Sequence, residues 1–235
     1  RDRTVKDESL NLNMRREEGL WVVPPEYSDR FISTRNLNGR GILLEQGLAD
    51  HLYLNDGQGQ FQSEAWDSGF FRDADGTKLD APPLDWSLSA SFADVNNDGF
   101  PDLYVCADFI SPDRFWINQG GKGFQAVSRA ALSQSSWSSM CVDWADIDLD
   151  GDWDFFVGDM LSRDHQRRQY QRANHTPNAW TDWAFEQRRQ YMRNTLFLNR
   201  GDSSFAELGR FSGLAASEWT WNCLWLDVDR DGAED

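Results

Sequence analysis

The sequence predicts an all-β fold assembled from repeated units of four antiparallel strands. Two short elements carry this prediction, because each occurs three times along the 235 residues. One element is an acidic nine-residue loop, and the other is a β-hairpin with a Gly-containing turn. The two elements also keep a fixed spacing, which is typical of a repeat protein.

The acidic loop occurs at residues 94–102, 146–154 and 227–235. Asp or Asn stands at positions 1, 3, 5 and 9 of each copy, and Gly stands at position 6. Ca²⁺ prefers about six to eight oxygen ligands, and alternate residues of a tight loop can point their carboxylates at one centre. Gly permits the sharp turn, and the backbone carbonyl at position 7 can add a ligand. The sequence therefore predicts three calcium sites.

The predicted ligands are the side chains at positions 1, 3, 5 and 9 and the backbone carbonyl at position 7. In the first loop they are Asp94, Asn96, Asp98, Asp102 and the carbonyl of Phe100. In the second loop they are Asp146, Asp148, Asp150, Asp154 and the carbonyl of Asp152. In the third loop they are Asp227, Asp229, Asp231, Asp235 and the carbonyl of Ala233.

A solvated acidic turn is the alternative interpretation of each loop, because Asp, Asn and Gly are common turn residues. The occurrence of three copies in register disfavours this alternative. In addition, carboxylates crowded into one loop without a cation repel each other. The loops are not EF-hands, which need a bidentate Glu at position 12, where Val105 and Val157 stand here. No Cys or His lies in any loop, which argues against a soft metal. The β-rich flanks predict that the loop connects two strands.

The hairpin element is a short strand, a turn with Gly and an aromatic residue. It occurs at residues 51–61, 114–124 and 195–205. Asn and Gly in such turns accept positive φ angles. From Asn118 to Asp146 the chain advances by 28 residues, and from Asn199 to Asp227 it again advances by 28. The corresponding first interval is 39 residues, which predicts an insertion near residues 73–80.

One repeat thus reads as strand, acidic loop, strand, link, strand, hairpin turn and strand. Four antiparallel strands per unit are the content of a propeller blade. We therefore predict a β-propeller fragment with about two complete four-stranded blades and further partial ones. The first complete blade has predicted strands near residues 86–94, 101–108, 113–118 and 123–128. The second blade runs from about residue 137 to residue 208, and a third begins near residue 217.

The predicted organisation has two parts. Residues 1–50 form an N-terminal segment that belongs to an incomplete blade without an acidic loop, and residues 51–235 hold the propeller repeats. The second blade carries an Arg-rich insertion at residues 161–193. Two helices are predicted within it, at 162–172 and 181–193, with Ser162 and Thr181 as N-caps.

Two interpretations of the insertion stay open. Its basic side chains could bind an anionic ligand or a glycan, or they could pair with acidic blade edges and cover the propeller. These side chains are Arg163, His165, Arg167, Arg168 and His175. The second interpretation is favoured, because a charge run is more often a solvated or paired face. Long insertions in repeat proteins are nevertheless frequent places for function.

Composition narrows the class of protein. The formal net charge is −16, and an acidic balance argues against a nucleic-acid partner. The eleven carboxylates assigned as ligands account for most of this charge, and three Ca²⁺ would bring it to about −10.

The sequence contains no run of 18 apolar residues, so it predicts no membrane span. Three cysteines predict free thiols, with a bridge between Cys141 and Cys223 as the alternative. A chain that starts on Arg1 and ends on a ligand residue is expected to be a fragment.

The segments Phe92–Val105 and Trp144–Val157 resemble the FG-GAP/VCBS repeat. This repeat builds the calcium-bearing propellers of integrin α-subunits, and it also occurs in secreted bacterial proteins and in the cartilage acidic protein family. The resemblance covers roughly residues 50–235. It implies an extracellular, cell-surface or periplasmic β-propeller that binds Ca²⁺ and serves in adhesion, recognition or scaffolding. The Arg-rich insertion and residues 1–50 depart from the generic repeat, so no particular protein or glycan partner is implied.

The function predicted from the sequence is that of a binding or scaffold module and not of an enzyme. The alternative is a secreted propeller enzyme, a hydrolase or lyase acting on polysaccharide, since a fold of this type does not decide the function. The sequence shows no nucleophile–base pair, no G-x-S-x-G motif and no His cluster with metal spacing. The adjacent Asp164 and His165 are the only pair that hints at acid–base chemistry. A titratable pair facing an open pocket beside the insertion would favour the enzyme.

Overall fold

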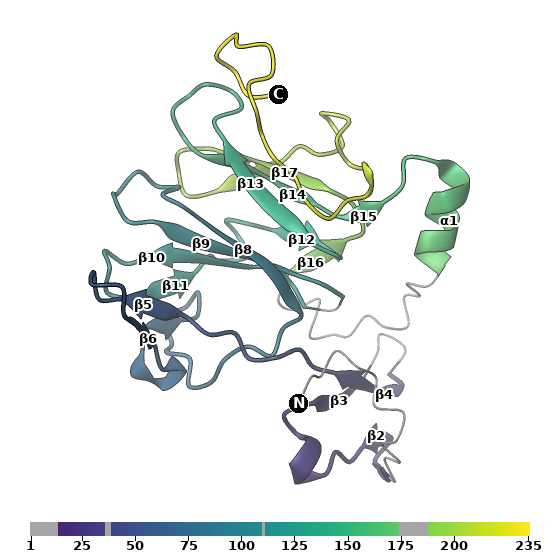
Figure 1. The fold of residues 1–235 in the computed structure, drawn as a ribbon. Helices are drawn as coiled ribbons and strands as arrows, with labels where there is room; N and C mark the ends of the chain where they lie inside the picture. Colours follow the sequence, from purple (N-terminus) through teal and green to yellow (C-terminus); the bar gives the residue numbers. More distant parts are fainter. Residues whose placement is uncertain (1–13, 36–38, 110, 174–187) are drawn as a thin grey trace.

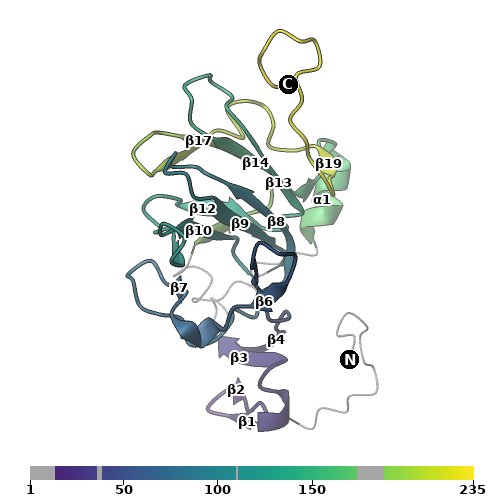
Figure 2. The same ribbon diagram turned by 60° about the vertical axis from the view of Figure 1, so that its left-hand side comes forward.

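The computed structural model describes residues 14–35, 39–109, 111–173 and 188–235. Within these ranges the protein is mostly β-strand, with α1 (His165–Ala173) as the one α-helix. Two larger sheets lie side by side at the centre of the molecule (Figure 1). The N-terminal strands lie at one end, and the loop at residues 227–235 lies at the other (Figures 1 and 2). The prediction of a mainly β protein is confirmed in this coarse form.

The first large sheet contains the four predicted strands of the first blade. They are β8 (Ser87–Ala93), β9 (Asp102–Ala107), β10 (Arg114–Asn118) and β11 (Phe124–Ala126). These strands pair antiparallel in the order β11-β10-β9-β8. A fifth strand, β7 (Phe71–Arg72), pairs parallel with β11 and was not predicted. It is held by the Phe124 N–H, which donates to the Phe70 carbonyl at 2.6 Å.

The second large sheet repeats this arrangement. Its strands are β13 (Cys141–Ala145), β14 (Asp154–Gly158), β17 (Thr195–Asn199) and β18 (Phe205–Glu207), in that order and antiparallel. The chain leaves the sheet between β14 and β17, where the insertion was predicted. The two sheets therefore have the strand content of two blades, and the described residues form no closed ring.

The remaining strands form small sheets around the two large ones. Four of them make N-terminal hairpins: β1 (Arg16–Glu17) with β2 (Leu20–Trp21), and β3 (Phe31–Arg35) with β4 (Gly41–Glu45). The first predicted hairpin element is β5 (Tyr53–Asn55) with β6 (Phe61–Ser63). Two further pairs are β12 (Gln134–Ser136) with β16 (Arg189–Tyr191), and β15 (Met160–Leu161) with β19 (Glu218–Trp219). Two short 3₁₀ helices are η1 (Pro25–Tyr27) and η2 (Trp66–Ser68). The domain division at residue 50 stays a prediction.

The main core lies between the two large sheets and is strongly aromatic. Tyr104 of the first sheet and Phe155 of the second are completely buried, with ring centroids 5.0 Å apart. Trp144 reaches across the same interface, and its Nε1–H donates to Ser91 Oγ at 3.0 Å. Burying a large apolar side chain stabilises the fold by about 1.5–3 kcal/mol. Because the strands are pleated, alternate residues of each strand point toward the interface between the two sheets. The packing of these residues joins the two repeats.

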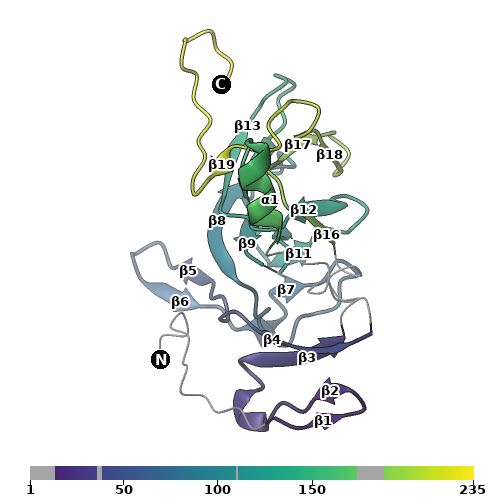
Figure 3. The ribbon, with the colours of Figure 1, turned by 90° about the vertical axis from the view of Figure 1, so that its right-hand side faces the viewer.

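The insertion is only partly as predicted. Helix α1 confirms a helix in the first predicted segment, but Asp164 and not Ser162 is its N-cap, because Asp164 Oδ1 accepts the Arg167 N–H at 2.9 Å. The second predicted helix, at 181–193, lies largely outside the described residues, together with Thr181 and His175. Its C-terminal part is wrong, since Arg189–Tyr191 form β16 and pair parallel with β12. Figure 3 shows α1 on the flank of the second sheet beside β19.

All three cysteines are free thiols in the structure. Cys106 and Cys141 are buried, and Cys223 is half-buried. Among the described residues, no helix has the length and apolar character that a membrane crossing requires.

Candidate metal-binding loops

The three acidic loops share one backbone conformation. The loops at 94–102 and 146–154 connect β8 to β9 and β13 to β14, so two of the predicted strand–loop–strand units are confirmed. In each loop the residues at positions 4 and 6 have positive φ angles, and position 6 is always Gly. The φ angles at position 4 are 56° for Asn97, 60° for Leu149 and 65° for Arg230, and those at position 6 are 88° for Gly99, 93° for Gly151 and 94° for Gly232. Gly is the residue that adopts such angles without steric cost, which explains its recurrence.

The carboxylate at position 1 shapes each loop from inside. In the second loop Asp146 Oδ1 accepts the Asp150 N–H and Asp146 Oδ2 accepts the Gly151 N–H, both at 3.0 Å. Asp94 and Asp227 accept the corresponding pairs of backbone N–H groups at 2.8–3.1 Å. These bonds curl the backbone around the position-1 side chain, so the loop is preorganised by its own backbone.

The carboxylates at position 5 hold the next part of each loop. Asp98, Asp150 and Asp231 each accept, through Oδ1, the backbone N–H of the residue at position 7. The donor residues are Phe100, Asp152 and Ala233, at 2.9, 3.0 and 3.0 Å. In the described structure only Oδ1 of each position-5 carboxylate binds position 7, so Oδ2 is not used in this contact. The carbonyls at position 7 stay predicted ligands.

The carboxylate at position 9 ties the loop to the hairpin of the same sheet. Asp154 is completely buried, and its Oδ2 accepts the Ile147 N–H at 3.0 Å while its Oδ1 accepts the Asn199 N–H at 2.8 Å. Asp102 is equally buried and accepts the N–H groups of Val95 and Asn118 at 3.0 and 2.7 Å. The two repeated sequence elements therefore meet at one side chain in each blade. In the third loop Asp235 accepts the Val228 N–H at 3.1 Å.

Two of the loops bring three carboxylates close enough to share one cation. One oxygen from each of Asp146, Asp148 and Asp154 lies within 4.8 Å of the others, and the same holds for Asp227, Asp229 and Asp235. These are positions 1, 3 and 9 of the second and third loops. In the first loop Asn96 occupies position 3, so an amide oxygen takes the place of one carboxylate, and its Nδ2–H donates to Asp98 Oδ2 at 3.1 Å.

The buried ligand positions carry pKa values far above the ordinary range of Asp. Burial raises the pKa of Asp154 to about 6, and the nearby carboxylates of Asp148 and Asp150 raise it further. Burial likewise raises the pKa of Asp102 to about 6, with Asp98 and Asp94 adding to the effect. The pKa of Asp148 is also raised, by desolvation first and then by Asp150 and Asp146. Each effect disfavours the ionised form in the absence of a neighbouring positive charge.

The donor set of the loops fits a hard divalent cation. Every predicted side-chain ligand offers oxygen, which Ca²⁺ and Mg²⁺ prefer. Among the described residues, no Lys or Arg forms an ion pair with any of these carboxylates. A buried carboxylate such as Asp154, close to other carboxylates and without a counter-charge, is costly, and a bound cation would remove that cost. The geometry is compatible with Ca²⁺ in the second and third loops.

Two asparagines that the sequence did not predict to be functional join neighbouring loops. Asn97 of the first loop donates from Nδ2 to Asp152 Oδ1 of the second at 2.9 Å. Asn199 donates from Nδ2 to the Val95 carbonyl of the first loop at 2.9 Å, and its backbone N–H is bound by Asp154. The recurrence of Asn at the end of each hairpin strand was visible in the sequence, but the cross-blade contact depends on how the sheets stack.

A comparison with protein families identifies one part of this region. Residues 94–157 match the FG-GAP-like repeat. The match begins at position 1 of the first loop and ends in β14, so it contains two of the three loops and the strands between them. It supports the FG-GAP/VCBS resemblance for this stretch, and FG-GAP-like repeats are typical of extracellular repeat modules. No curated protein matches the chain in sequence.

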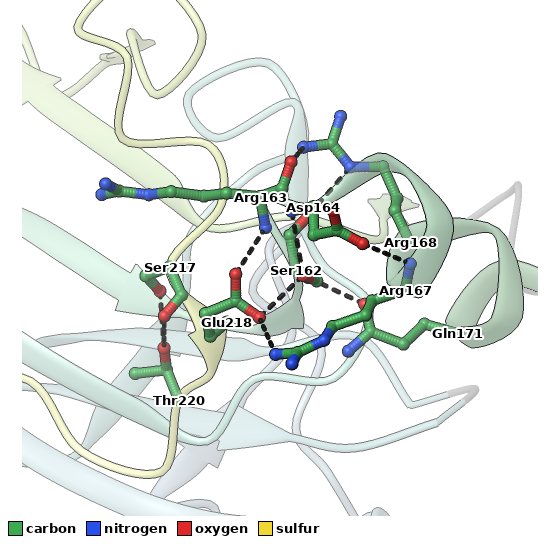
Figure 4. A network of polar contacts seen from close by, with 9 residues as sticks. All are labelled: Ser162, Arg163, Asp164, Arg167, Arg168, Gln171, Ser217, Glu218 and Thr220. Atoms are coloured by element: carbon green, nitrogen blue, oxygen red, sulfur yellow. Dashed lines mark hydrogen bonds and ion pairs between the residues drawn. The ribbon is translucent and has the colours of Figure 1, made fainter.

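In the Asp164–His165 pair, Asp164 has a structural role. Asp164 Oδ1 caps α1, and the Asp164 N–H donates to Ser162 Oγ at 3.0 Å. Ser162 Oγ in turn donates to the Glu218 carboxylate at 2.7 Å (Figure 4). Asp164 therefore lies in a network that anchors the start of the helix to β19.

Proposed function

We propose that this chain is a calcium-binding, extracellular β-propeller repeat module that serves in adhesion, recognition or scaffolding rather than in catalysis. The observation that carries the proposal is the convergence of Asp146, Asp148 and Asp154 on one centre, in a loop whose backbone is fixed by its own hydrogen bonds. The match of residues 94–157 to an FG-GAP-like repeat supports the extracellular assignment.

Calcium would act here as a structural ion. It would neutralise carboxylates that the fold brings together and hold the strand–loop–strand unit closed. Asp154 would be the ligand that passes this constraint to the hairpin, because its other oxygen binds the Asn199 N–H. The predicted ligand sets are those given above for the three loops, with one cation in each.

The test is a calcium titration of the whole chain by isothermal calorimetry. We expect Asp148→Ala to remove one binding site or weaken it at least tenfold, because the variant deletes one of three clustered carboxylates. Asp75→Ala is the matched control, since Asp75 is an exposed carboxylate in the turn at 73–76 whose hydrogen bonds are local, to Thr77. Absence of calcium binding in the unaltered chain, or equal binding by both variants, would refute the proposed site.

A further inference from the structure

A cavity of about 550 Å³ lies beside α1, and arginines dominate its polar lining. Arg163 and Arg168 come from the start of the insertion, Arg193 from the link between β16 and β17, and Arg210 from the segment after β18. Its volume lies within the ~300–1,000 Å³ that is usual for small-molecule sites. No Asp or Glu lines it, although the chain as a whole carries a net charge of −16.

The first two arginines are fixed by bonds to backbone carbonyls. Arg163 Nε donates to the Ala216 carbonyl at 2.7 Å, and Arg168 donates from Nε to the Ser162 carbonyl at 2.9 Å. Figure 4 shows the Arg163 side chain extending away from α1 and from Glu218. A guanidinium has five N–H donors, so these bonds position the groups and leave most donors and the full charge available.

The third arginine is the buried member of the set. Arg193 is only 8% exposed and lies 4.8 Å from the centre of the Tyr191 ring, which also lines the cavity. Its Nη2 pairs with Glu207 at 2.5 Å, but its buried Nε–H has no hydrogen-bond partner within the described structure. Arg193 therefore contributes a fixed guanidinium to the wall of the cavity, with Glu207 as its ion-pair partner.

Acidic side chains near the cavity do not balance its charge. Glu207 is paired with Arg193, and Glu218 lies 3.8 Å from Arg167, which does not line the cavity. Within the described ranges, no carboxylate forms an ion pair with Arg163, Arg168 or Arg210. Three arginines without an ion-pair partner among the described residues, Arg163, Arg168 and Arg210, therefore line one cavity.

We propose that this cavity binds a small ligand carrying an oxyanion, that is, a carboxylate, sulfate or phosphate group. Guanidinium groups match the planar, two-oxygen edge of such anions and form charge-assisted hydrogen bonds with them. Apolar residues such as Met192 and Leu161 complete the lining, so the uncharged part of the ligand meets hydrocarbon. This site is separate from the acidic loops and does not depend on the calcium proposal.

The test is equilibrium binding of four matched sugars to the whole chain. Glucuronate, glucose 6-sulfate and glucose 6-phosphate each carry one oxyanion on the same scaffold, and glucose is the neutral reference. We expect at least one of the three anions to bind, glucose not to bind, and affinity to fall as NaCl is raised. The anion that binds best identifies the oxyanion class.

Two variants separate the cavity from general charge effects. Arg163→Gln combined with Arg210→Gln should weaken binding at least tenfold, because each lost charge-assisted bond is worth a large factor in affinity. Arg200→Gln is the matched control, since Arg200 is exposed in the β17–β18 turn, outside the cavity lining. Circular dichroism and thermal melts establish that all variants are folded. The proposal is overturned if none of the anions binds, if glucose binds equally, or if the control variant weakens binding as much as the double variant.

Discussion

Replacing Asp113 by Asn should abolish part of the pH dependence of stability in this protein. Asp113 is 1% exposed, and its carboxylate accepts the Ala107 N–H at 2.9 Å and the hydroxyls of Tyr104 and Ser139 at 2.8 and 2.7 Å. Burial raises the pKa of this carboxyl to about 7, although these bonds and the nearby Arg188 act in the opposite direction.

The sign and size of the effect follow from this raised pKa. An unfolded Asp has a pKa of ~3.9. Between about pH 4 and pH 7 the folded state therefore holds a proton that the unfolded state has lost, so the free energy of unfolding falls as pH rises. At about 1.4 kcal/mol per pKa unit, the total over this window is about 4 kcal/mol. For a chain of this size that corresponds to roughly 8–16 °C in Tm.

Asn is a suitable replacement because the second sheet already uses it. Asn194 accepts the Asp159 N–H at 2.7 Å, just as Asp113 accepts the Ala107 N–H in the first sheet. The assay is thermal unfolding of both proteins from about pH 4.5 to about pH 8. The difference in Tm between the Asp113→Asn variant and the unaltered chain should grow in favour of the variant as pH rises. Parallel pH profiles for the two proteins would refute the reasoning, and the exposed Asp75→Asn serves as control.

Three further outcomes are expected. A calcium chelator should lower Tm, because an ion that binds only the folded state adds about 2.7 kcal/mol per site at a hundredfold excess over Kd; an unchanged melt would contradict this. Glu207→Gln should cost roughly 3–5 kcal/mol in urea unfolding, since the buried Arg193 is left without its counter-charge; an unchanged unfolding midpoint would contradict this. Gly123→Ala should destabilise more than Gly57→Ala, because an added Cβ at Gly123 meets the Phe70 carbonyl at 2.4 Å while Gly57 faces open space; equal losses would argue against that clash.

The strands and loops of the two large sheets could be predicted because their signals are local. Apolar alternation marks β8, and Gly99 and Gly151 stand where the backbone needs positive φ. The interval from the hairpin Asn to the first Asp of the next loop is 28 residues in two repeats, and such a constant spacing is also visible in the sequence. The strand bounds of the first blade agree with the prediction to within two residues.

The features that the sequence did not predict depend on contacts between distant residues. Two-residue strands such as β7 carry no periodic pattern, and β7 forms because the Phe71 ring stacks on Phe124 at 5.7 Å. Ser162 was a plausible N-cap by residue type, but its hydroxyl is engaged by Glu218 of β19, more than fifty residues away. The arginine-lined cavity likewise needs the segments around residues 163, 193 and 210 to converge, which spacing alone does not reveal.

The contacts of Asn199 indicate that the proposed metal binding would be coupled to the packing of the two large sheets. Its backbone N–H binds Asp154 of the second loop, and its side-chain amide binds the Val95 carbonyl of the first loop. Val95 itself lies in the buried core between the sheets, and its N–H binds Asp102 of the first loop. A cation that fixes Asp154 or Asp102 therefore also fixes the residues that join the two blades. We expect Asn199→Ala to weaken calcium affinity although Asn199 is not a predicted ligand. The matched control is Asn118→Ala, because the Asn118 side chain binds only within its own sheet. Calorimetric titration of both variants measures how much of the affinity comes from the contact between the two sheets, and equal affinities would contradict this coupling.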